Sequence, residues 1–150
     1  MAIAIGQPAD LIDLVGTELG VTDWYPITQA RVSEFADATG DHQWIHTDPR
    51  RATRGPFGGT IAHGYLTLSL ASRAIGELLR IEHLQAAVNY GVNKVRFPAP
   101  VPVGSKVRAS ARVASARARE SGVEAVLAVT FEVAGSPRPA CVADCVVIYR

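Results

Sequence analysis

The chain has 150 residues, of which 48% are hydrophobic and 19% are charged, and its formal net charge is +1. This length fits one domain spanning residues 1–150, and a chain of this size buries enough surface to fold without disulfides. The near-neutral charge excludes the strongly basic surface of a typical nucleic-acid-binding domain, so we expect no nucleic-acid partner.

We expect neither an export signal nor a membrane segment. The N-terminal stretch MAIAIGQPADLIDLVG lacks the basic start and the long apolar core of a secretory signal. No run of about 18 apolar residues is present, so we expect no membrane span. Cys141 and Cys145 lie in one predicted strand, about 13 Å apart, which is too far for a disulfide. We expect reduced thiols in the core and a cytoplasmic setting.

Two segments are predicted to be helices. Residues 27–40 (ITQARVSEFADATG) place apolar side chains on one helical face, at Val32, Phe35, Ala36 and Thr39. We expect Thr28 to be the N-cap of this helix and Gly40 its C-terminal stop. After a glycine-rich turn at 55–59, residues 60–80 predict one long helix that is apolar on most sides and therefore buried.

The second half of the chain alternates apolar and polar residues, as strands do. Four strands are expected, within 93–100, 105–120, 122–133 and 140–150. The last three are joined by the short turns Ser121-Gly122 and GSPRP, which predict an antiparallel meander. Two of the strands should bury one face each, through Val107, Ala109, Ala111 and Val113 in the first and Val123, Ala125, Leu127, Val129, Phe131 and Val133 in the second.

A long buried helix followed by antiparallel strands is an α+β arrangement. The most economical version is the hot-dog fold, in which a curved antiparallel sheet wraps around a long central helix. One such unit leaves an edge strand open, and open edges usually pair with a second copy. We therefore expect a homodimer with an extended sheet.

Residues 40–48 (GDHQWIHTD) crowd several titratable groups into the loop that follows the first helix. Asp41 and His46 are the candidate catalytic pair, because a carboxylate and an imidazole that converge on one water can activate it and handle its proton. The structural alternative is that Asp41 only caps the backbone of Gln43 or Trp44.

A metal site is the other alternative for this loop. His42 and His46 have i, i+4 spacing, and further ligands are available from Asp41, Asp48 and His63. The chain has neither a CxxC nor an HExxH motif, and its cysteines are far from this loop in the sequence. We expect no metal.

His63 and Gly64 lie where the long helix begins its apolar run. Free N–H groups and the dipole at a helix start can hold an oxyanion, whereas the alternative is that Gly64 only permits tight packing. Ser72 lies two turns further on, where a serine usually hydrogen-bonds to a backbone carbonyl. Lys94 and Arg96 should face outward, toward an acidic cofactor or simply toward solvent.

GDHQWIH followed by PFGGTIAHGYLTLSL resembles the MaoC-like hydratase family, specifically its single-hot-dog (R)-specific enoyl-CoA hydratases. The similarity covers roughly residues 15–149. It is strongest to a mycobacterial and actinobacterial branch that also contains nodulation-protein-N-like sequences and shares NYGVNKVRFPAPVPVGS. Within the family motif, the positions that match are Phe35, Gly40, Asp41, Ile45 and His46.

The resemblance implies a role for each matched position. Asp41 and His46 correspond to the catalytic pair, the Gly64 N–H to the oxyanion donor, and Ser72 to a serine that arranges the catalytic hydrogen bonds. Trp44, His63 and Asn93 are counted with Gly64 and Ser72 as substrate-binding residues. The family Asn-Pro is replaced by Gln43-Trp44, so we expect Trp44 either to line the acyl pocket or to anchor the loop.

The implied activity is reversible hydration of trans-2-enoyl-CoA to (R)-3-hydroxyacyl-CoA in fatty-acid metabolism, a hydro-lyase reaction that needs no cofactor. The implied partners are an enoyl-CoA or enoyl-acyl-carrier-protein substrate and a second copy of the chain. Two alternatives remain: a hot-dog acyl-CoA thioesterase and a non-catalytic acyl-thioester-binding subunit.

Overall fold

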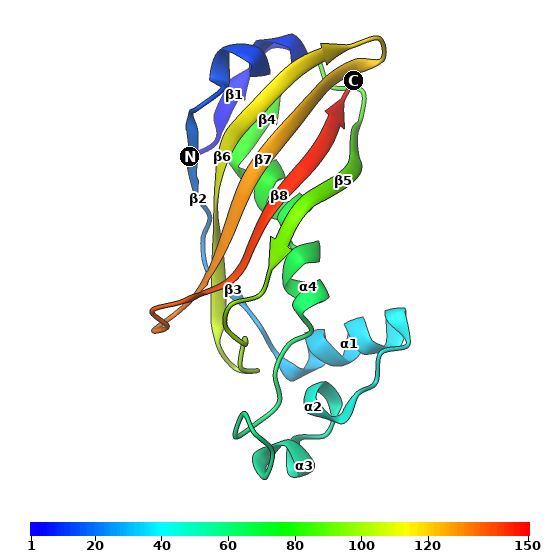
Figure 1. The fold of residues 1–150 in the computed structure, drawn as a ribbon, viewed down its shortest axis with the longest axis vertical. Coiled ribbons are helices and arrows are strands. Elements are labelled where there is room, and N and C mark those ends of the chain that lie inside the picture. Colours follow the sequence, from blue (N-terminus) through cyan, green and yellow to red (C-terminus); the bar gives the residue numbers. More distant parts are fainter.

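A computed structural model describes residues 1–150, and its largest element is a six-stranded antiparallel sheet (Figure 1). The main strand order is β2-β6-β7-β8-β5, and β3 also pairs with β6. The sheet contains β2 Glu18–Val21, β3 Tyr25–Pro26, β5 Ala87–Arg96, β6 Lys106–Arg119, β7 Gly122–Val133 and β8 Pro139–Tyr149. The predicted meander is confirmed as β6–β7–β8, and β5 forms the edge beside β8.

The alternation read from the sequence sets which face of the sheet is buried. Along β7 every second residue is buried, from Val123 to Val133, and the predicted apolar residues of β6 are buried as well. The side-chain period of a strand is two, so one face of each strand carries the apolar residues toward the core. Phe131 and Leu127 in β7 are fully buried.

The long predicted helix is shorter than expected. Residues 60–63 are not helical, α4 spans Gly64–Ser69, α5 spans Ala71–Leu78, and β4 begins at Leu79. Leu70 keeps a right-handed helical backbone between α4 and α5, so the two form one interrupted rod. The predicted helix was too long at its C-terminal end because residues 79–81 pair as a parallel strand with β1 (Ile3–Ile5), which is distant in the sequence.

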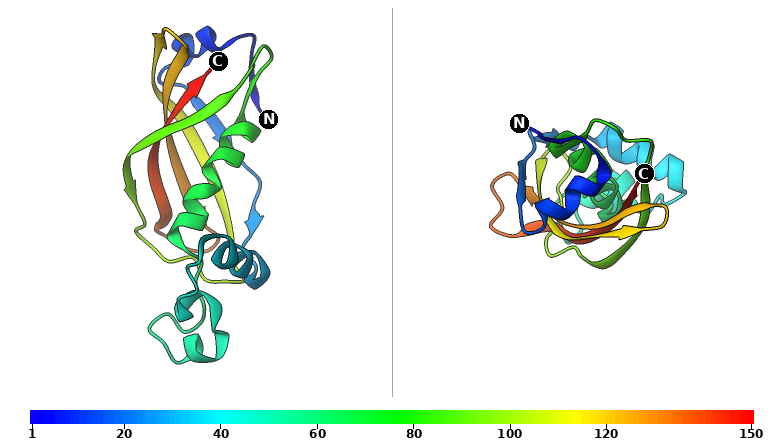
Figure 2. Two further views of the ribbon diagram at one scale, coloured as in Figure 1. Left: turned by 90° about the vertical axis from the view of Figure 1, so that its right-hand side faces the viewer. Right: turned by 90° about the horizontal axis from the view of Figure 1, so that it is seen from above.

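Helices α4 and α5 lie along one face of the curved sheet, as the second view shows (Figure 2). Their inward side chains join the main core: Leu66, Ala71, Ala74, Ile75 and Leu78. The opposite side is exposed at Tyr65, Ser72, Arg73 and Glu77, so the helical segment is not buried all round as expected. Apolar residues on several faces had suggested full burial, but the sheet covers only one side.

The first helix forms where the sequence predicts it, as α1 Gln29–Thr39. The Thr28 hydroxyl accepts a hydrogen bond from the Arg31 N–H at 3.1 Å, and Gly40 ends the helix with a φ of 78°. This left-handed backbone is the conformation that favours glycine at a helix end. Both predicted caps are confirmed.

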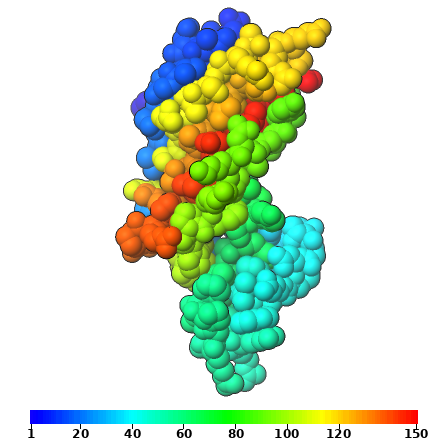
Figure 3. All heavy atoms as spheres, viewed as in Figure 1, coloured from blue at the N-terminus to red at the C-terminus, as the bar shows by residue number.

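Two short helices, α2 Trp44–Thr47 and α3 Pro49–Thr53, follow α1. Together the three helices form a lobe beyond one end of the sheet, seen in cyan and green-cyan at the bottom of the space-filling view (Figure 3). The lobe leads through residues 54–63 directly into α4. The segment that carries the candidate catalytic residues is therefore placed at the start of the central helix.

The N-terminal region adds elements that the sequence did not predict: the 3₁₀ helix η1 Pro8–Leu14 and the short strands β1, β2 and β3. Leu11 of η1 is fully buried in the main core. Cys141 and Cys145 are free and buried, as expected. None of the helices has the length and hydrophobicity needed to cross a bilayer.

Candidate active site

Asp41 and His46 lie on either side of the turn that joins α1 to α2. The left-handed backbone of Gly40 ends α1, so the chain reverses just before Asp41. Asp41 is exposed, and its Oδ1 accepts a hydrogen bond from the Gln43 N–H at 3.3 Å. The capping interpretation of Asp41 is therefore realised, while its second oxygen, Oδ2, is free to act elsewhere.

His46 is buried, and its ring has a defined proton arrangement. Nδ1 lies 2.7 Å from the carbonyl oxygen of Ile61. A carbonyl oxygen only accepts hydrogen bonds, so Nδ1 carries the proton and Nε2 keeps its lone pair. Burial has the largest effect on the pKa of His46 and lowers it, and the hydrogen bond to the Ile61 carbonyl opposes this lowering. The nearby His63 imidazole lowers the pKa and Asp41 raises it, each by less, and the net result is a lowered pKa. A neutral histidine with an unprotonated Nε2 has the protonation state that a general base requires.

His63 joins the two members of the pair. Its Nε2 lies 2.9 Å from the backbone oxygen of Asp41 and 3.9 Å from the Asp41 carboxylate. Its ring stacks on His46, with centroids 3.9 Å apart, and Phe35 packs at 4.9 Å on the same imidazole. His63 is 3% exposed, so it holds the Asp41 backbone beside the His46 ring.

Gly64 is the first residue of α4, and its N–H therefore has no acceptor within the helix. A Cβ at this position would lie 3.2 Å from the ring of Phe97. Gly64 is thus compatible with both expected roles. The missing side chain leaves room for the ring of Phe97, and the N–H of Gly64 is available to a ligand.

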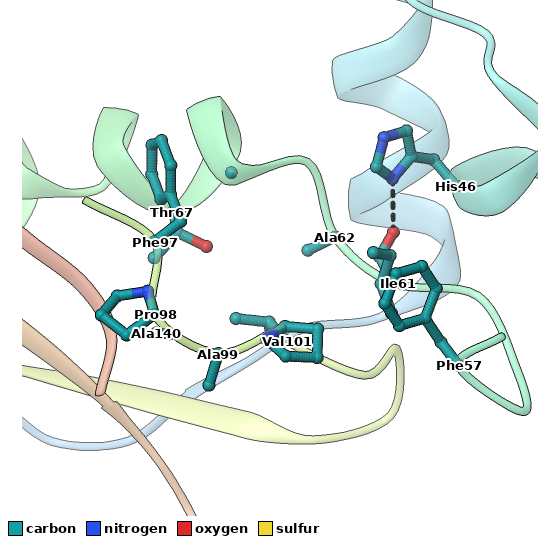
Figure 4. A pocket seen from close by; sticks show the side chains of 12 residues that line it. His46, Phe57, Ile61, Ala62, Thr67, Phe97, Pro98, Ala99, Val101 and Ala140 are labelled. Atoms are coloured by element: carbon teal, nitrogen blue, oxygen red, sulfur yellow. Dashed lines mark hydrogen bonds between the residues drawn. The ribbon is translucent and has the colours of Figure 1, made fainter. Parts of the chain in front are cut away.

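Two hollows meet at these residues and share His46, Gly64 and Phe97. The first, of about 240 Å³, is the more polar and is lined by Asp41, His46, His63, Gly64, Tyr65 and Phe97. The second, of about 330 Å³, is mainly apolar (Figure 4). His46 and Gly64 thus line both hollows, whereas Asp41 lines only the more polar one.

The other predicted substrate-binding residues are placed elsewhere. Ser72 lies eight residues after Gly64, about 12 Å along the helix, where its hydroxyl accepts a hydrogen bond from the Asn89 amide at 3.2 Å. Ser72 and Asn89 line two further hollows between the helix and β5. Asn93 is exposed on β5, between residues where the strand register shifts.

Trp44 packs between α2 and α3 in the segment that carries the candidate catalytic residues. The Arg51 guanidinium lies 4.3 Å from the centre of the Trp44 ring. A Cβ at Gly55 would come within 2.9 Å of the same ring, so the glycine is needed for this packing. Of the two roles expected for Trp44, the structure shows contacts that tie α2 to α3, and Trp44 lines neither of the two hollows that meet at His46.

Asp41, His46 and His63 each place one potential metal-ligand atom within 4.8 Å of the others. Three ligands are the minimum for a zinc site, but His63 Nε2 points its proton at the Asp41 carbonyl. The expectation of no metal stays a prediction. His42 is exposed near Asp37, and Asp48 caps α3 by accepting the Arg51 N–H at 3.0 Å, so neither belongs to the pair.

Gln29 is a site residue that the sequence did not reveal. Its side-chain Nε2 donates to the backbone oxygen of His46 at 2.8 Å, and its Oε1 accepts from the Thr60 hydroxyl at 2.7 Å. Thr60 precedes Ile61, whose carbonyl fixes the His46 ring. Gln29 therefore connects the segment that contains His46 with the segment of Thr60 and Ile61. A glutamine at the first turn of a helix carries no sequence signal for contacts 17 and 31 residues away.

Comparison with known proteins shows which family the chain is similar to. The family model for the MaoC like domain matches residues 12–133. The 3-hydroxyacyl-thioester dehydratase Z of Mycobacterium tuberculosis is 53% identical over 142 residues, which cover 94% of each chain. Nodulation protein N of Rhizobium leguminosarum bv. viciae is 41% identical over 145 residues, covering 95% of this chain and 90% of its own.

A solved structure supports the same assignment. The (R)-hydratase from A. caviae involved in PHA biosynthesis superimposes with a TM-score of 0.73 at 27% identity, covering 91% of this chain and 96% of its own. The hot-dog fold expected from the sequence is thereby confirmed, as is the family resemblance read from GDHQWIH and HGYLTLSL. The chain belongs to the MaoC-like family.

Proposed function

We propose that this protein is an (R)-specific enoyl-thioester hydratase, a hydro-lyase of fatty-acid metabolism. It hydrates trans-2-enoyl-CoA reversibly to (R)-3-hydroxyacyl-CoA. One observation carries the proposal: a neutral His46 with a free Nε2 shares a single hollow with the Asp41 carboxylate and with the start of α4 at Gly64. Similarity to the mycobacterial 3-hydroxyacyl-thioester dehydratase supports the reaction, and similarity to the A. caviae (R)-hydratase supports the R configuration of the product.

Polarisation of the thioester is the first requirement of the reaction. The Gly64 N–H donates to the thioester carbonyl oxygen, and the partial positive charge at the helix start favours the enolate that develops there. Electron withdrawal into this oxygen makes C3 of the enoyl chain electrophilic. The absence of a side chain at Gly64 allows the carbonyl to approach the backbone closely.

Activation of water is the second requirement. Asp41 accepts a hydrogen bond from a water molecule and orients it, while His46 Nε2 takes one of its protons as the oxygen bonds to C3. The proton on His46 then passes to C2, which restores the carbonyl and completes the addition of one water. The Ile61 carbonyl holds His46 in the required tautomer throughout. The reverse sequence removes water from the 3-hydroxyacyl thioester.

A homodimer is part of the proposal. β5 is the edge of the sheet and pairs only with β8, and nine of its ten residues are exposed. Its exposed apolar side chains include Val88, Tyr90 and Val92. An edge strand of this length with apolar residues is a surface that a second copy covers. Sedimentation should give twice the chain mass, and a monomer would contradict this part of the proposal.

Three further expectations accompany the proposal. Residues 1–150 form a single hot-dog domain, supported by one main core cluster that includes residues from Leu11 to Tyr149. The protein acts in the cytoplasm, supported by two buried cysteines that are free. Its partners are the acyl thioester and a second copy, without nucleic acid or membrane.

Hydration of crotonyl-CoA by the wild type, Asp41→Asn and His46→Ala tests the proposal. Each variant should lose at least about 2 kcal/mol of transition-state stabilisation, a factor of about 30 in kcat/KM. Asp37→Asn and His42→Ala are matched controls from the exposed surface nearby and should retain activity. Wild-type rates in both site variants would contradict the assignment of the pair.

The same assay separates the two alternatives. Release of free CoA thiol from the wild type would indicate a thioesterase, whereas loss of the enoyl absorbance without thiol release indicates hydration. Tight binding of acyl-CoA with no turnover on any chain length would indicate a non-catalytic subunit.

A further inference from the structure

The apolar hollow beside His46 contains one polar side chain that the proposed reaction does not use. Its lining is Phe57, Ile61, Ala62, Phe97, Pro98, Ala99, Pro100, Val101 and Ala140, together with His46, Gly64 and Thr67. Apart from the His46 imidazole, the Thr67 hydroxyl is the only side-chain hydrogen-bonding group in this list. Figure 4 shows its oxygen turned toward the space between Phe97, Ala62 and Val101.

The Thr67 hydroxyl is buried and has no hydrogen-bond partner in the chain. Thr67 is 1% exposed, and its Oγ1 contacts neither a donor nor an acceptor. A threonine or serine inside a helix usually donates to the carbonyl one turn earlier. Ser69, two positions along, does so with the Tyr65 oxygen at 2.6 Å. The Thr67 hydroxyl does not.

The other buried threonines make Thr67 an exception. The Thr60 hydroxyl donates to Gln29 at 2.7 Å, and the Thr22 hydroxyl donates to the Asp23 oxygen and accepts from the Ala109 N–H. Buried hydroxyls are paired in proteins because an unmade bond carries the full desolvation penalty. The hydroxyl of Thr67 is thus left for a group that enters the hollow.

The position of Thr67 along the helix indicates which part of a bound substrate would contact its hydroxyl. Thr67 follows Gly64 by three residues, about 4.5 Å along the helix axis. With the thioester carbonyl at Gly64 and the reacting carbons at His46, an acyl chain that continues into the apolar hollow passes Thr67 beyond C3. The hydroxyl therefore faces the unreactive part of the chain.

We propose that this hollow is a subsite for acyl chains that carry an oxygen substituent beyond C3, such as a hydroxyl or keto group, and that Thr67 hydrogen-bonds to this oxygen. This inference rests on the proposed hydratase function. A site with a buried hydroxyl disfavours a purely apolar chain, because that chain leaves the hydroxyl unpaired. Thr67 is then a specificity residue, distinct from the groups that activate water and polarise the thioester.

Two thioesters of equal length test the subsite: trans-2-hexenoyl-CoA and trans-6-hydroxy-2-hexenoyl-CoA. The wild type should prefer the hydroxylated substrate in kcat/KM. Thr67→Val keeps the shape of the side chain and removes the hydroxyl, so this preference should fall about tenfold through a gain on the plain chain and a loss on the hydroxylated one. Thr67→Ser should keep the preference, and Thr130→Val on the outer face of β7 should leave it unchanged.

An unchanged preference in Thr67→Val, with both substrates turned over, would overturn the subsite while leaving the hydratase function intact. If the wild type hydrates neither substrate, the proposed function fails, and equilibrium binding still decides on the subsite. Calorimetric titration with hexanoyl-CoA and 6-hydroxyhexanoyl-CoA should then show tighter binding of the hydroxylated ligand to the wild type but not to Thr67→Val. Equal affinities of the wild type for both ligands would overturn it.

Discussion

The sheet strands β6–β8 and the segment from Asp41 to Gly64 are held together in different ways. In the sheet, continuous backbone pairing and a regular set of buried apolar side chains repeat along each strand. In the site segment, a few side-chain hydrogen bonds connect distant pieces of chain: Gln29 to His46 and Thr60, His46 to Ile61, and His63 to Asp41.

The difference separates stability from activity. Loss of one buried side chain from the sheet removes packing from the main core, whereas loss of one hydrogen bond in the site segment should displace a residue of the proposed active site by a small distance. Such a displacement is costly to the reaction even when the fold is unaffected. Substitutions in the two regions should therefore affect different measurements.

Phe131→Ala in β7 should have the largest effect on stability. Phe131 is fully buried in the main core, and truncation of a buried phenylalanine costs about 3–5 kcal/mol. The free energy of unfolding from chemical denaturation gives the loss. Thr130→Ala, the adjacent residue on the opposite face, should change it by less than about 0.5 kcal/mol. Similar losses in both variants would contradict a single buried face.

Gln29→Met should have the complementary effect, on activity more than on stability. Methionine retains the length of glutamine but neither donates to the His46 oxygen nor accepts from Thr60. We expect kcat to fall about tenfold, which corresponds to about 1.4 kcal/mol, with little change in KM. Gln43→Met in the same loop is the control, because the Gln43 side chain makes no hydrogen bond. A rise in KM with an unchanged kcat would argue against a positioning role.

The pH dependence of kcat/KM should report the buried state of His46. Burial lowers the pKa of His46 by more than the hydrogen bond to the Ile61 carbonyl raises it, so the neutral base persists below its ordinary pKa of about 6.5. Activity should be retained as pH falls through about 6.5 and decline only at lower pH. A profile in which the acidic decline is centred at or above about 6.5 would place His46 in a solvated environment.

Arg51→Ala should give the smallest effect, a loss of about 0.5–1 kcal/mol in the free energy of unfolding. The guanidinium of Arg51 stacks over Trp44, and this contact ties α3 to α2. Arg50→Ala, the neighbouring exposed arginine, removes the same charge without a stacking partner. Equal effects from the two variants would show that charge, and not the stacking contact, is responsible.

Much of the fold was predictable because local patterns agreed with the tertiary outcome. Thr28 and Gly40 marked the ends of α1, and the alternation in 106–113 and 123–133 identified the buried faces of β6 and β7. The central helix was placed correctly but made too long. Local apolarity cannot distinguish a helix end from the strand that residues 79–81 form with β1, because that pairing joins segments more than 70 residues apart.

For the site, the motif located Asp41, His46 and Gly64, and the structure brings these three to one hollow. Ser72, which the same resemblance indicated, and Asn93, the other substrate-binding candidate, lie away from that hollow within the chain. Gln29 and the unpaired hydroxyl of Thr67 escaped prediction. The role of each depends on which atoms surround its side chain in the fold. A glutamine or threonine in a helix has the same sequence pattern whether its side chain is hydrogen-bonded, buried without a partner or solvated.

The sequence by itself determined the first helix, the β6–β8 meander and the buried faces of β6 and β7, because these follow from side-chain periodicity and turn chemistry over short distances. Only the tertiary structure decided which nitrogen of His46 is free, which carbonyl fixes it and which hydroxyl remains unpaired in the hollow. Those properties depend on atoms from segments 15 or more residues apart, and they exist only once the core has brought the segments together.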